Sequence, residues 1–238
     1  MQRTGTTEAS WADWPVLRTL PAVTRPQGRV VVVSAHPDDE VLGAGGLIAS
    51  LAGTRAVVSF VAVTDGEASH PPTPALPPEA LAARRVDELV RALSTLGLAP
   101  PDLSRLGLPD SHVDKQVDVL TERIEEHIRG ADLVLCPAED GHSDHDAVSR
   151  ATKAAAEGRI RVWEFPIWVW AWTRPGDLAL PWERARRYEL SASEQRVKRR
   201  ALACFVTQVR PFPDAHGGTM LPPDVLEHFE RPFEVFLT

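Results

Sequence analysis

Short apolar runs alternate with longer amphipathic stretches along the first two thirds of this chain. The valine-rich run over 29–35 predicts a buried central strand, because strands of a parallel sheet are covered on both faces. Further strands are expected over 56–63, 103–108 and 132–136. Helices are expected over 39–52, 79–96 and 113–129 and from about residue 144. This alternation is typical of βαβ units and therefore predicts an α/β fold.

The pattern beyond residue 159 is less regular, with two extended segments, a helix over 193–206 and a tail that ends in EVFLT. A length of 238 residues suits a single domain, 1–238, which we expect to be Rossmann-like, with a mostly parallel sheet and helices on both faces. Residues 1–28 form an N-terminal lead segment. The proline-rich loop over 68–78 has no periodic pattern, and we expect it to be a mobile lid beside the site.

Composition excludes several classes of partner. The formal net charge is −7, whereas nucleic-acid binding needs a concentrated basic surface. No apolar stretch reaches the ~20 residues of a membrane span, and the N-terminus lacks the apolar core of an export signal. The sequence thus predicts a cytoplasmic protein without a membrane span or a nucleic-acid partner; homo-oligomerisation stays open.

Chemistry-bearing residues gather where two predicted strands give way to helices. The first cluster runs from His36 to Glu40 and the second from His142 to His145. The simplest interpretation is helix capping, which accounts for the acids but not for the histidines. Because carboxyl ends of parallel strands share one sheet edge, where ligands bind, we expect the two clusters to meet. Two imidazoles and a carboxylate then supply the three protein ligands of a catalytic zinc site, and an Asp and a His remain as base and acid.

Both clusters resemble known motifs. AHPDDEVLGAGG (35–46) and GHSDHDAVSRA (141–151) resemble the two diagnostic motifs of the LmbE/PIG-L family of zinc-dependent deacetylases. The resemblance implies one zinc ion per chain, with a base and an acid beside it and polar contacts to the sugar. The implied zinc ligands are His36, Asp39 and His145. The implied catalytic residues are Asp38 as general base, His142 as the acid that protonates the leaving amine, and Asp144 in its support. The implied sugar contacts are Arg85 and Asp110.

The same resemblance implies a hydrolase that removes an N-acetyl group from a small-molecule amino-sugar conjugate. Two alternatives remain: a metal-dependent hydrolase of another amide or ester, and a non-catalytic glycoconjugate-binding protein. Ser143 stands where the family most often has proline. Asp140 stands where some members have a tyrosine that stabilises the oxyanion.

Two further patterns carry predictions about packing. The glycine run beginning at Gly43 fails as a dinucleotide-binding motif, because its third glycine position is Ile48, and we expect it to allow close helix–sheet packing. Trp168, Trp170 and Trp172 alternate and should share one face of an extended segment. That face would be core or subunit contact, or an apolar wall for the non-sugar part of a substrate.

Overall fold

A seven-stranded sheet runs through the part of the chain that the computed structural model describes, residues 5–73, 76–177, 179–211 and 218–238. The order across the sheet is β3-β2-β1-β4-β5-β7-β6. The strands are β1 (Arg29–Ser34), β2 (Val57–Ala62), β3 (Asp102–Arg105), β4 (Leu133–Pro137), β5 (Arg161–Phe165), β6 (Ala185–Glu189) and β7 (Phe233–Leu237). The predicted strands are thus present, and the EVFLT tail is the larger part of β7.

Strand direction confirms the predicted mostly parallel sheet. The strands from β3 to β5 are parallel, and β7 runs antiparallel to both β5 and β6. In β1, Val32 pairs with Phe60 of β2 on one side and Leu135 of β4 on the other. The chain therefore builds outward from β1 in one direction and later returns to add β4 in the other. The β1/β4 boundary is the point where an open α/β sheet binds its ligands.

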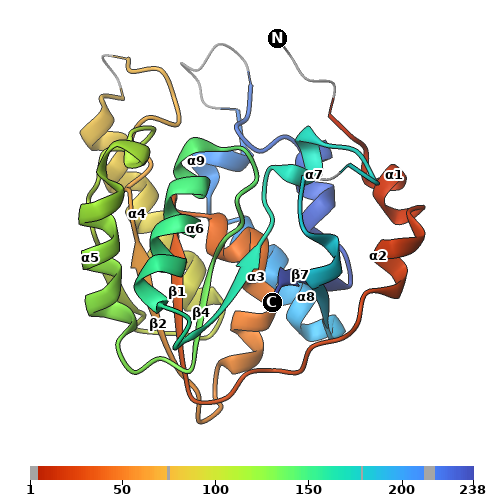
Figure 1. The fold of residues 1–238 in the computed structure, drawn as a ribbon. Coiled ribbons are helices and arrows are strands. Elements are labelled where there is room, and N and C mark those ends of the chain that lie inside the picture. Colours follow the sequence, from red (N-terminus) through yellow and green to blue (C-terminus); the bar gives the residue numbers. More distant parts are fainter. Residues whose placement is uncertain (1–4, 74–75, 178, 212–217) are drawn as a thin grey trace.

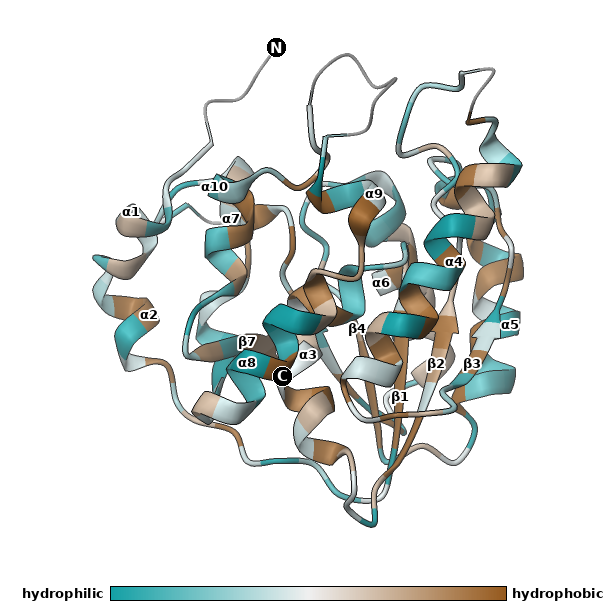
Figure 2. Ribbon diagram, turned by 180° about the vertical axis from the view of Figure 1, so that it is seen from behind, coloured by the Kyte–Doolittle hydropathy of each residue, from teal (hydrophilic) through white to brown (hydrophobic). Residues whose placement is uncertain are grey.

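Helices cover both faces of the sheet, as predicted (Figure 1). One face carries α3 (Asp39–Leu51), α4 (Pro78–Thr95) and α8 (Ala192–Leu202); the other carries α5 (Val117–Ile128) and α6 (Ser143–Ala156). Alternate residues of β1 enter different cores: Val30 and Val32 pack with the α3 side, whereas Val31 and Val33 pack with the α5–α6 side. Figure 2 accordingly shows apolar central strands between helices with polar outer faces.

The glycine run allows close packing of α3, as expected. A Cβ added at Gly43 would lie 2.2 Å from Cδ2 of Phe165 in β5, and one added at Gly46 would lie 2.4 Å from Cδ2 of Leu190. Both distances are far below van der Waals contact. These glycines therefore let α3 pack closely against Phe165 and Leu190.

Short helices complete the described chain: α1 (Glu8–Ala12), α2 (Pro15–Thr19), α7 (Val169–Trp172), α9 (Val206–Val209) and α10 (Pro223–Leu226). Single 3₁₀ turns lie at Val113–Gln116, Trp182–Arg184 and Glu227–Phe229. The predicted helix over 113–129 is thus a 3₁₀ turn followed by α5, and the one over 193–206 stops at Leu202. Within the described ranges, no helix combines the length and apolar character that crossing a membrane requires.

The prediction that three tryptophans share one face of an extended segment is wrong. They lie in and beside α7, where Trp168 and Trp172, four residues apart, stack with ring centroids 5.0 Å apart. Trp170 is 3% exposed and packs on the opposite side against Trp11, at 5.1 Å between centroids. The alternating spacing of the tryptophans is compatible with a strand. The helical turn is favoured instead because it buries Trp170 under the N-terminal segment. The two outer tryptophans remain on the side of the site.

Candidate active site

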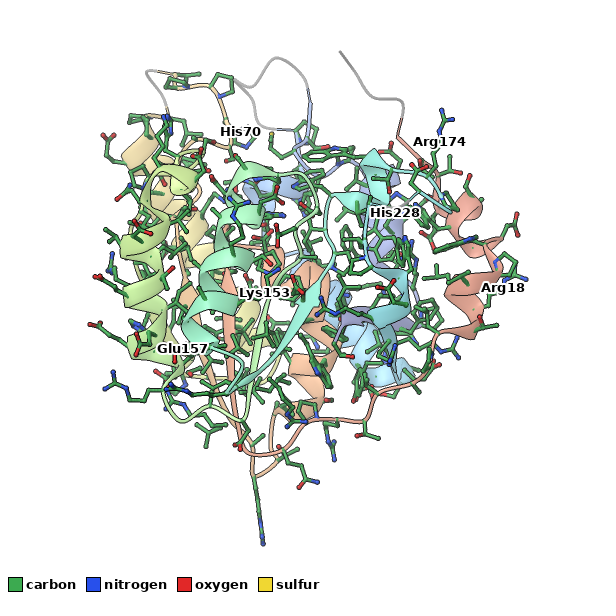
Figure 3. The ribbon with its side chains drawn as sticks, in the orientation of Figure 1. Arg18, His70, Lys153, Glu157, Arg174 and His228 are labelled. Atoms are coloured by element: carbon green, nitrogen blue, oxygen red, sulfur yellow. The ribbon has the colours of Figure 1, made fainter. Side chains whose placement is uncertain are left out.

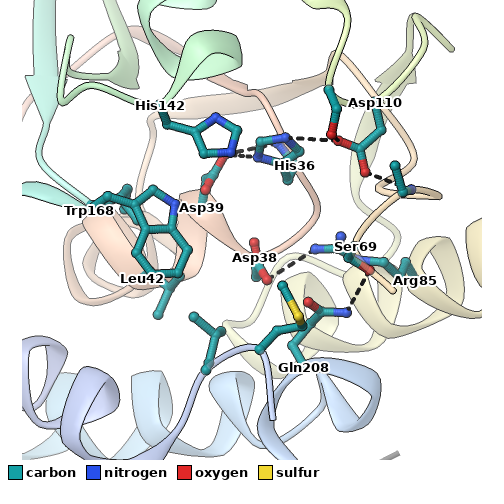
Figure 4. Close-up of a pocket in the computed structure, with 15 residues that line it drawn as sticks. His36, Asp38, Asp39, Leu42, Ser69, Arg85, Asp110, His142, Trp168 and Gln208 are labelled. Atoms are coloured by element: carbon teal, nitrogen blue, oxygen red, sulfur yellow. Dashed lines mark hydrogen bonds and ion pairs between the residues drawn. The ribbon is translucent and has the colours of Figure 1, made fainter. Parts of the chain in front are cut away.

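Both motifs lie where the sequence placed them, after the carboxyl ends of β1 and β4. Asp38 is the N-cap of α3 and has a φ of 140°, a strained value for a residue with a side chain. His142 is the N-cap of α6. Between the two helix starts lies a cavity of about 160 Å³, which includes His36 and Asp39 in its lining (Figure 4). The sheet edge thus brings the two clusters together.

Asp39 stands between two imidazoles. Its Oδ1 lies 3.3 Å from Nε2 of His145, and its Oδ2 lies 3.6 Å from Nδ1 of His36. One ligand atom from each of the three residues lies within 4.8 Å of the others, and His145 is fully buried. Nε2 of His145 has no hydrogen-bond partner among the described residues, although such buried atoms are normally paired. A buried nitrogen that makes no hydrogen bond and faces the Asp39 carboxylate fits a metal ligand.

Carboxylates hold the outer nitrogen of each imidazole. Both oxygens of Asp140 lie 3.2 Å from Nδ1 of His145. Nε2 of His36 lies 3.2 Å from Asp144 and 3.3 Å from Asp110. A carboxylate at one ring nitrogen fixes the tautomer and turns the other nitrogen's lone pair to a metal. The donor set therefore fits a divalent cation such as zinc.

Electrostatics in the cluster also favour a cation. Burial by itself lowers the pKa of His145, but the Asp39 and Asp140 carboxylates raise it to about 10. Burial raises the pKa of Asp39, yet the facing histidines hold it well below its ordinary value. The carboxylates around His145 thus favour positive charge at this cluster. A second set of metal-ligand type, His36, His142 and Asp144, adjoins the first and shares His36.

Asp38 faces the cavity beside this cluster and is held by Arg85. Nη2 of Arg85 donates to Oδ2 of Asp38 at 3.1 Å and to the carbonyl oxygen of Pro37 at 2.7 Å. Burial raises the pKa of Asp38 to about 7, although Arg85 opposes the shift. A carboxylate with a pKa near neutrality suits a general base.

The expected sugar contacts, Arg85 and Asp110, both line the cavity but also bind protein groups. Arg85 is 2% exposed, and Nη1 donates to the carbonyl oxygen of Gly66 at 3.1 Å. Asp110 faces His36 and accepts a hydrogen bond from the backbone N–H of Ala68 at 2.8 Å. Burial raises the pKa of Asp110, but His36 outweighs that effect and lowers it to about 2. In this structure both residues position other parts of the site.

The side chain of Asp144 pairs with His36, and among the described residues it makes no hydrogen bond to His142. Its oxygens also accept the backbone N–H groups of Ser111 and Val113. The backbone N–H of Asp144 donates to Nδ1 of His142 at 3.3 Å. The neutral His142 ring therefore carries its proton on Nε2. Burial, then the charges of His145 and His36, lower the pKa of His142 to about 4.

Several contacts at the site could not be assigned from the sequence. Asp140 precedes His145 by five residues, and its place next to the motif was the only available signal. Glu40 is buried, its Oε1 has no partner in the described chain, and burial followed by Asp38 and Asp39 raises its pKa to about 8. The far side of the cavity comes from segments distant in sequence and without any motif: Ser69, Trp168, Gln208, Met220 and Leu221.

Fold and site together define the class of protein. It is an α/β protein whose sheet carries a His–Asp–His cluster of metal-ligand type at the β1/β4 boundary, and a buried carboxylate lies beside this cluster. Within that class, the chain belongs to the PIG-L family, described as GlcNAc-PI de-N-acetylase, because residues 31–156 match it over more than half of the chain.

A curated relative agrees with this membership. The 1D-myo-inositol 2-acetamido-2-deoxy-alpha-D-glucopyranoside deacetylase of Corynebacterium diphtheriae is 33% identical over 171 residues, which are 61% of this chain and 56% of that protein. The chain thus spans little more than half the length of this curated relative.

Two solved structures share the fold. The A40926 pseudoaglycone deacetylase superposes with a TM-score of 0.65 at 23% identity, covering 89% of this chain and 96% of that one. The 4-carboxy-2-hydroxymuconate hydratase of Pseudomonas putida superposes with a TM-score of 0.54 at 19% identity, covering 85% and 83%. At these identities the likeness confirms the α/β fold, not a reaction.

Proposed function

We propose that this protein is a zinc-dependent hydrolase that removes the acetyl group from the nitrogen of an amino-sugar conjugate. The observation that carries the proposal is the pairing of the His36–Asp39–His145 cluster with Asp38 in one cavity. The first group suits a metal ion and the second a proton acceptor. Amide hydrolysis needs both, because an amide is a poor electrophile and water a poor nucleophile at neutral pH.

Zinc held by His36, Asp39 and His145 would supply Lewis acidity to the amide carbonyl and to the attacking water. The chain itself supplies the proton transfers. As the new C–O bond forms, Asp38 takes a proton from water, which its pKa of about 7 allows near neutral pH. Arg85 keeps this carboxylate aimed at the cavity by the 3.1 Å contact.

The C–N bond breaks only if the departing nitrogen gains a proton, and we assign this step to His142. Burial, and then the positive charge of His145 and His36, lower its resting pKa. Negative charge that develops on the substrate offsets this effect and favours a protonated ring. For the step to balance, the proton that Asp38 took from water passes to His142, and His142 delivers it to the departing nitrogen as the C–N bond breaks. Acetate and a free amine are then the products.

The substrate class rests on the relatives. The Corynebacterium relative is named for an N-acetylated glucosaminide of inositol, and this chain shares its family. We therefore place a 2-acetamido sugar conjugate in the cavity. Asp140 occupies the position of the tyrosine that some members use, and its carboxylate faces His145. A tyrosine therefore supplies no oxyanion contact at this position.

The test combines metal and turnover. Zinc-loaded protein should carry about one zinc per chain and release acetate and free amine from N-acetylglucosaminides, whereas protein stripped with a chelator should not. Release of acetyl groups only from aryl esters or linear amides would favour another hydrolase. Binding without release would favour a glycoconjugate-binding protein. The hydratase with this fold is the reason to include an unsaturated carboxylate as a control substrate.

A further inference from the structure

The cavity has two unlike walls beyond the metal-ligand cluster. Ser69 and Gln208 form a polar wall on one side, and Trp168 with Leu42 lies across from them (Figure 4). Of these four residues, only Leu42 belongs to a sequence motif. The other three come from loops and short helices that the topology brings to this edge of the sheet.

Gln208 offers the cavity a hydrogen-bond acceptor. Its side-chain nitrogen donates to Oγ1 of Thr207 at 3.0 Å and to Oγ of Ser69 at 3.4 Å. No described residue donates a hydrogen bond to its Oε1, and Gln208 lines the cavity. Gln208 is 2% exposed, so its amide is held in place and not free in solvent.

A buried network fixes this polar wall from behind. The carboxylate of Glu88 in α4 accepts from the backbone N–H and the hydroxyl of Thr207, at 2.9 and 2.7 Å. The carbonyl oxygen of Thr207 lies 2.8 Å from Nε2 of His70, a buried residue at the start of the proline-rich loop (Figure 3). Three segments far apart in sequence are thus joined, and the wall is preorganised.

The start of the loop is therefore part of the cavity wall. Residues 74 and 75 lie outside the described residues, and the mobility of the loop stays a prediction.

We propose that Ser69 and Gln208 form a subsite that binds a hydroxyl group of the substrate's sugar ring. A hydroxyl both donates and accepts: it donates a hydrogen bond to Oε1 of Gln208, and its oxygen accepts one from the Ser69 hydroxyl. The indole of Trp168 on the opposite wall packs against the apolar face of the ring. This inference rests on the proposed function and adds to it the recognition of a hydroxyl remote from the acetamido group.

Substrates that lack one hydroxyl at a time test the subsite. We would compare an N-acetylglucosaminide with its 3-, 4- and 6-deoxy analogues, using wild type, Gln208→Leu and the control Gln195→Leu on α8. Wild type should lose roughly three- to tenfold in kcat/KM on one analogue, the usual worth of one neutral hydrogen bond. Gln208→Leu should show that loss on the parent sugar through KM, with kcat within about twofold. The kcat/KM of Gln208→Leu should then be the same on that analogue as on the parent sugar.

The control variant should discriminate as wild type does. Two outcomes would overturn the subsite. In one, Gln208→Leu still loses kcat/KM on the deoxy analogue as wild type does; in the other, wild type has the same kcat/KM on the parent sugar and on every deoxy analogue. Should Gln208→Leu fail to fold, Ser69→Ala provides the same comparison with the same expected outcomes. If wild type turns over no amino sugar at all, the proposed function fails by itself. Calorimetric binding of glucosamine and its deoxy analogues then decides the subsite independently.

Discussion

Both carboxylate oxygens of Asp140 lie 3.2 Å from Nδ1 of His145, on the side of the ring away from Asp39. The same carboxylate accepts the backbone N–H of Trp168 at 2.6 Å, which fixes its own orientation. Asp140 therefore aims His145 at the metal-ligand cluster. Because such outer carboxylates contribute to metal affinity, Asp140→Asn should weaken zinc binding by roughly 10- to 100-fold.

Competition with a fluorescent zinc chelator measures this change. Asp146→Asn is the matched control, because Asp146 also lies at the start of α6 but its side chain binds only the backbone N–H of Gly141 among the described contacts. Unchanged zinc affinity in Asp140→Asn, or an equal loss in the control, would show that Asp140 does not orient a zinc ligand.

The neighbouring aspartates should separate in one experiment. Asp39 faces both histidines, whereas Asp38 faces Arg85. Asp39→Asn should therefore lose zinc, because a neutral amide is the poorer ligand. Asp38→Asn should keep zinc but lose roughly 10²–10⁴ in kcat, the usual worth of general acid–base catalysis. Zinc content and kcat are measured side by side, and an Asp38→Asn enzyme within about threefold of wild type would exclude this base.

The contact between Arg85 and Asp38 gives a pH prediction. Activity needs the Asp38 carboxylate, so kcat/KM should rise with pH through about 7. The guanidinium favours the anionic form and lowers the pKa of Asp38, so Arg85→Met should raise that pKa and move the rising limb to higher pH. Arg85→Lys keeps the charge and should move it less. A higher KM with an unmoved limb would instead support the sugar contact that the sequence suggested.

Much of the site was predictable because its residues are local to strand–helix junctions. The valine run of β1 and the motif after it fix where His36 and Asp39 lie, and β4 does the same for His145. Parallel strands then bring the motifs together, whatever the rest of the chain does. The glycines of α3 were interpretable for the same reason, since close packing requires a missing side chain.

Contacts between distant segments were not predictable. No sequence pattern indicates that Asp144 would turn to His36, because that depends on the path of the loop after β3. Gln208 carries no motif, and the residue before it is held by Glu88 of the distant helix α4. The spacing of Trp168 and Trp170 indicated a strand, yet burial of Trp170 against Trp11 decided for a helix.

An ion pair joins the N-terminal segment to the C-terminal part of the chain. Glu8 in α1 pairs with Arg231, which is 8% exposed, through Nε at 2.6 Å. The Cζ atom of Arg231 lies 4.1 Å from the ring centroid of Trp170, so this pair supports the helix beside Trp168. Glu8→Ala leaves a buried guanidinium without its carboxylate, a loss of about 1–3 kcal/mol, which should lower Tm by roughly 3–10 °C. Asp13→Ala is the control, because Asp13 and its partner Arg18 are 86% and 65% exposed, and should change Tm little.

Acid titration and a double variant make the test of Glu8 specific. Burial raises the pKa of Glu8, but His228 and Arg231 outweigh it, so its folded pKa lies below the ordinary 4.5. A lowered carboxylate pKa stabilises the fold above 4.5, and the stabilisation is lost as pH falls through the folded pKa. The Tm gap between wild type and Glu8→Ala should therefore narrow in acid. Adding Arg231→Met to Glu8→Ala should recover part of the loss, because no charge is then left unpaired. Calorimetric scans at pH 7 and pH 3.5 measure both effects; a Glu8→Ala protein that melts like the Asp13→Ala control at pH 7 would show that this pair does not hold the N-terminal segment in place.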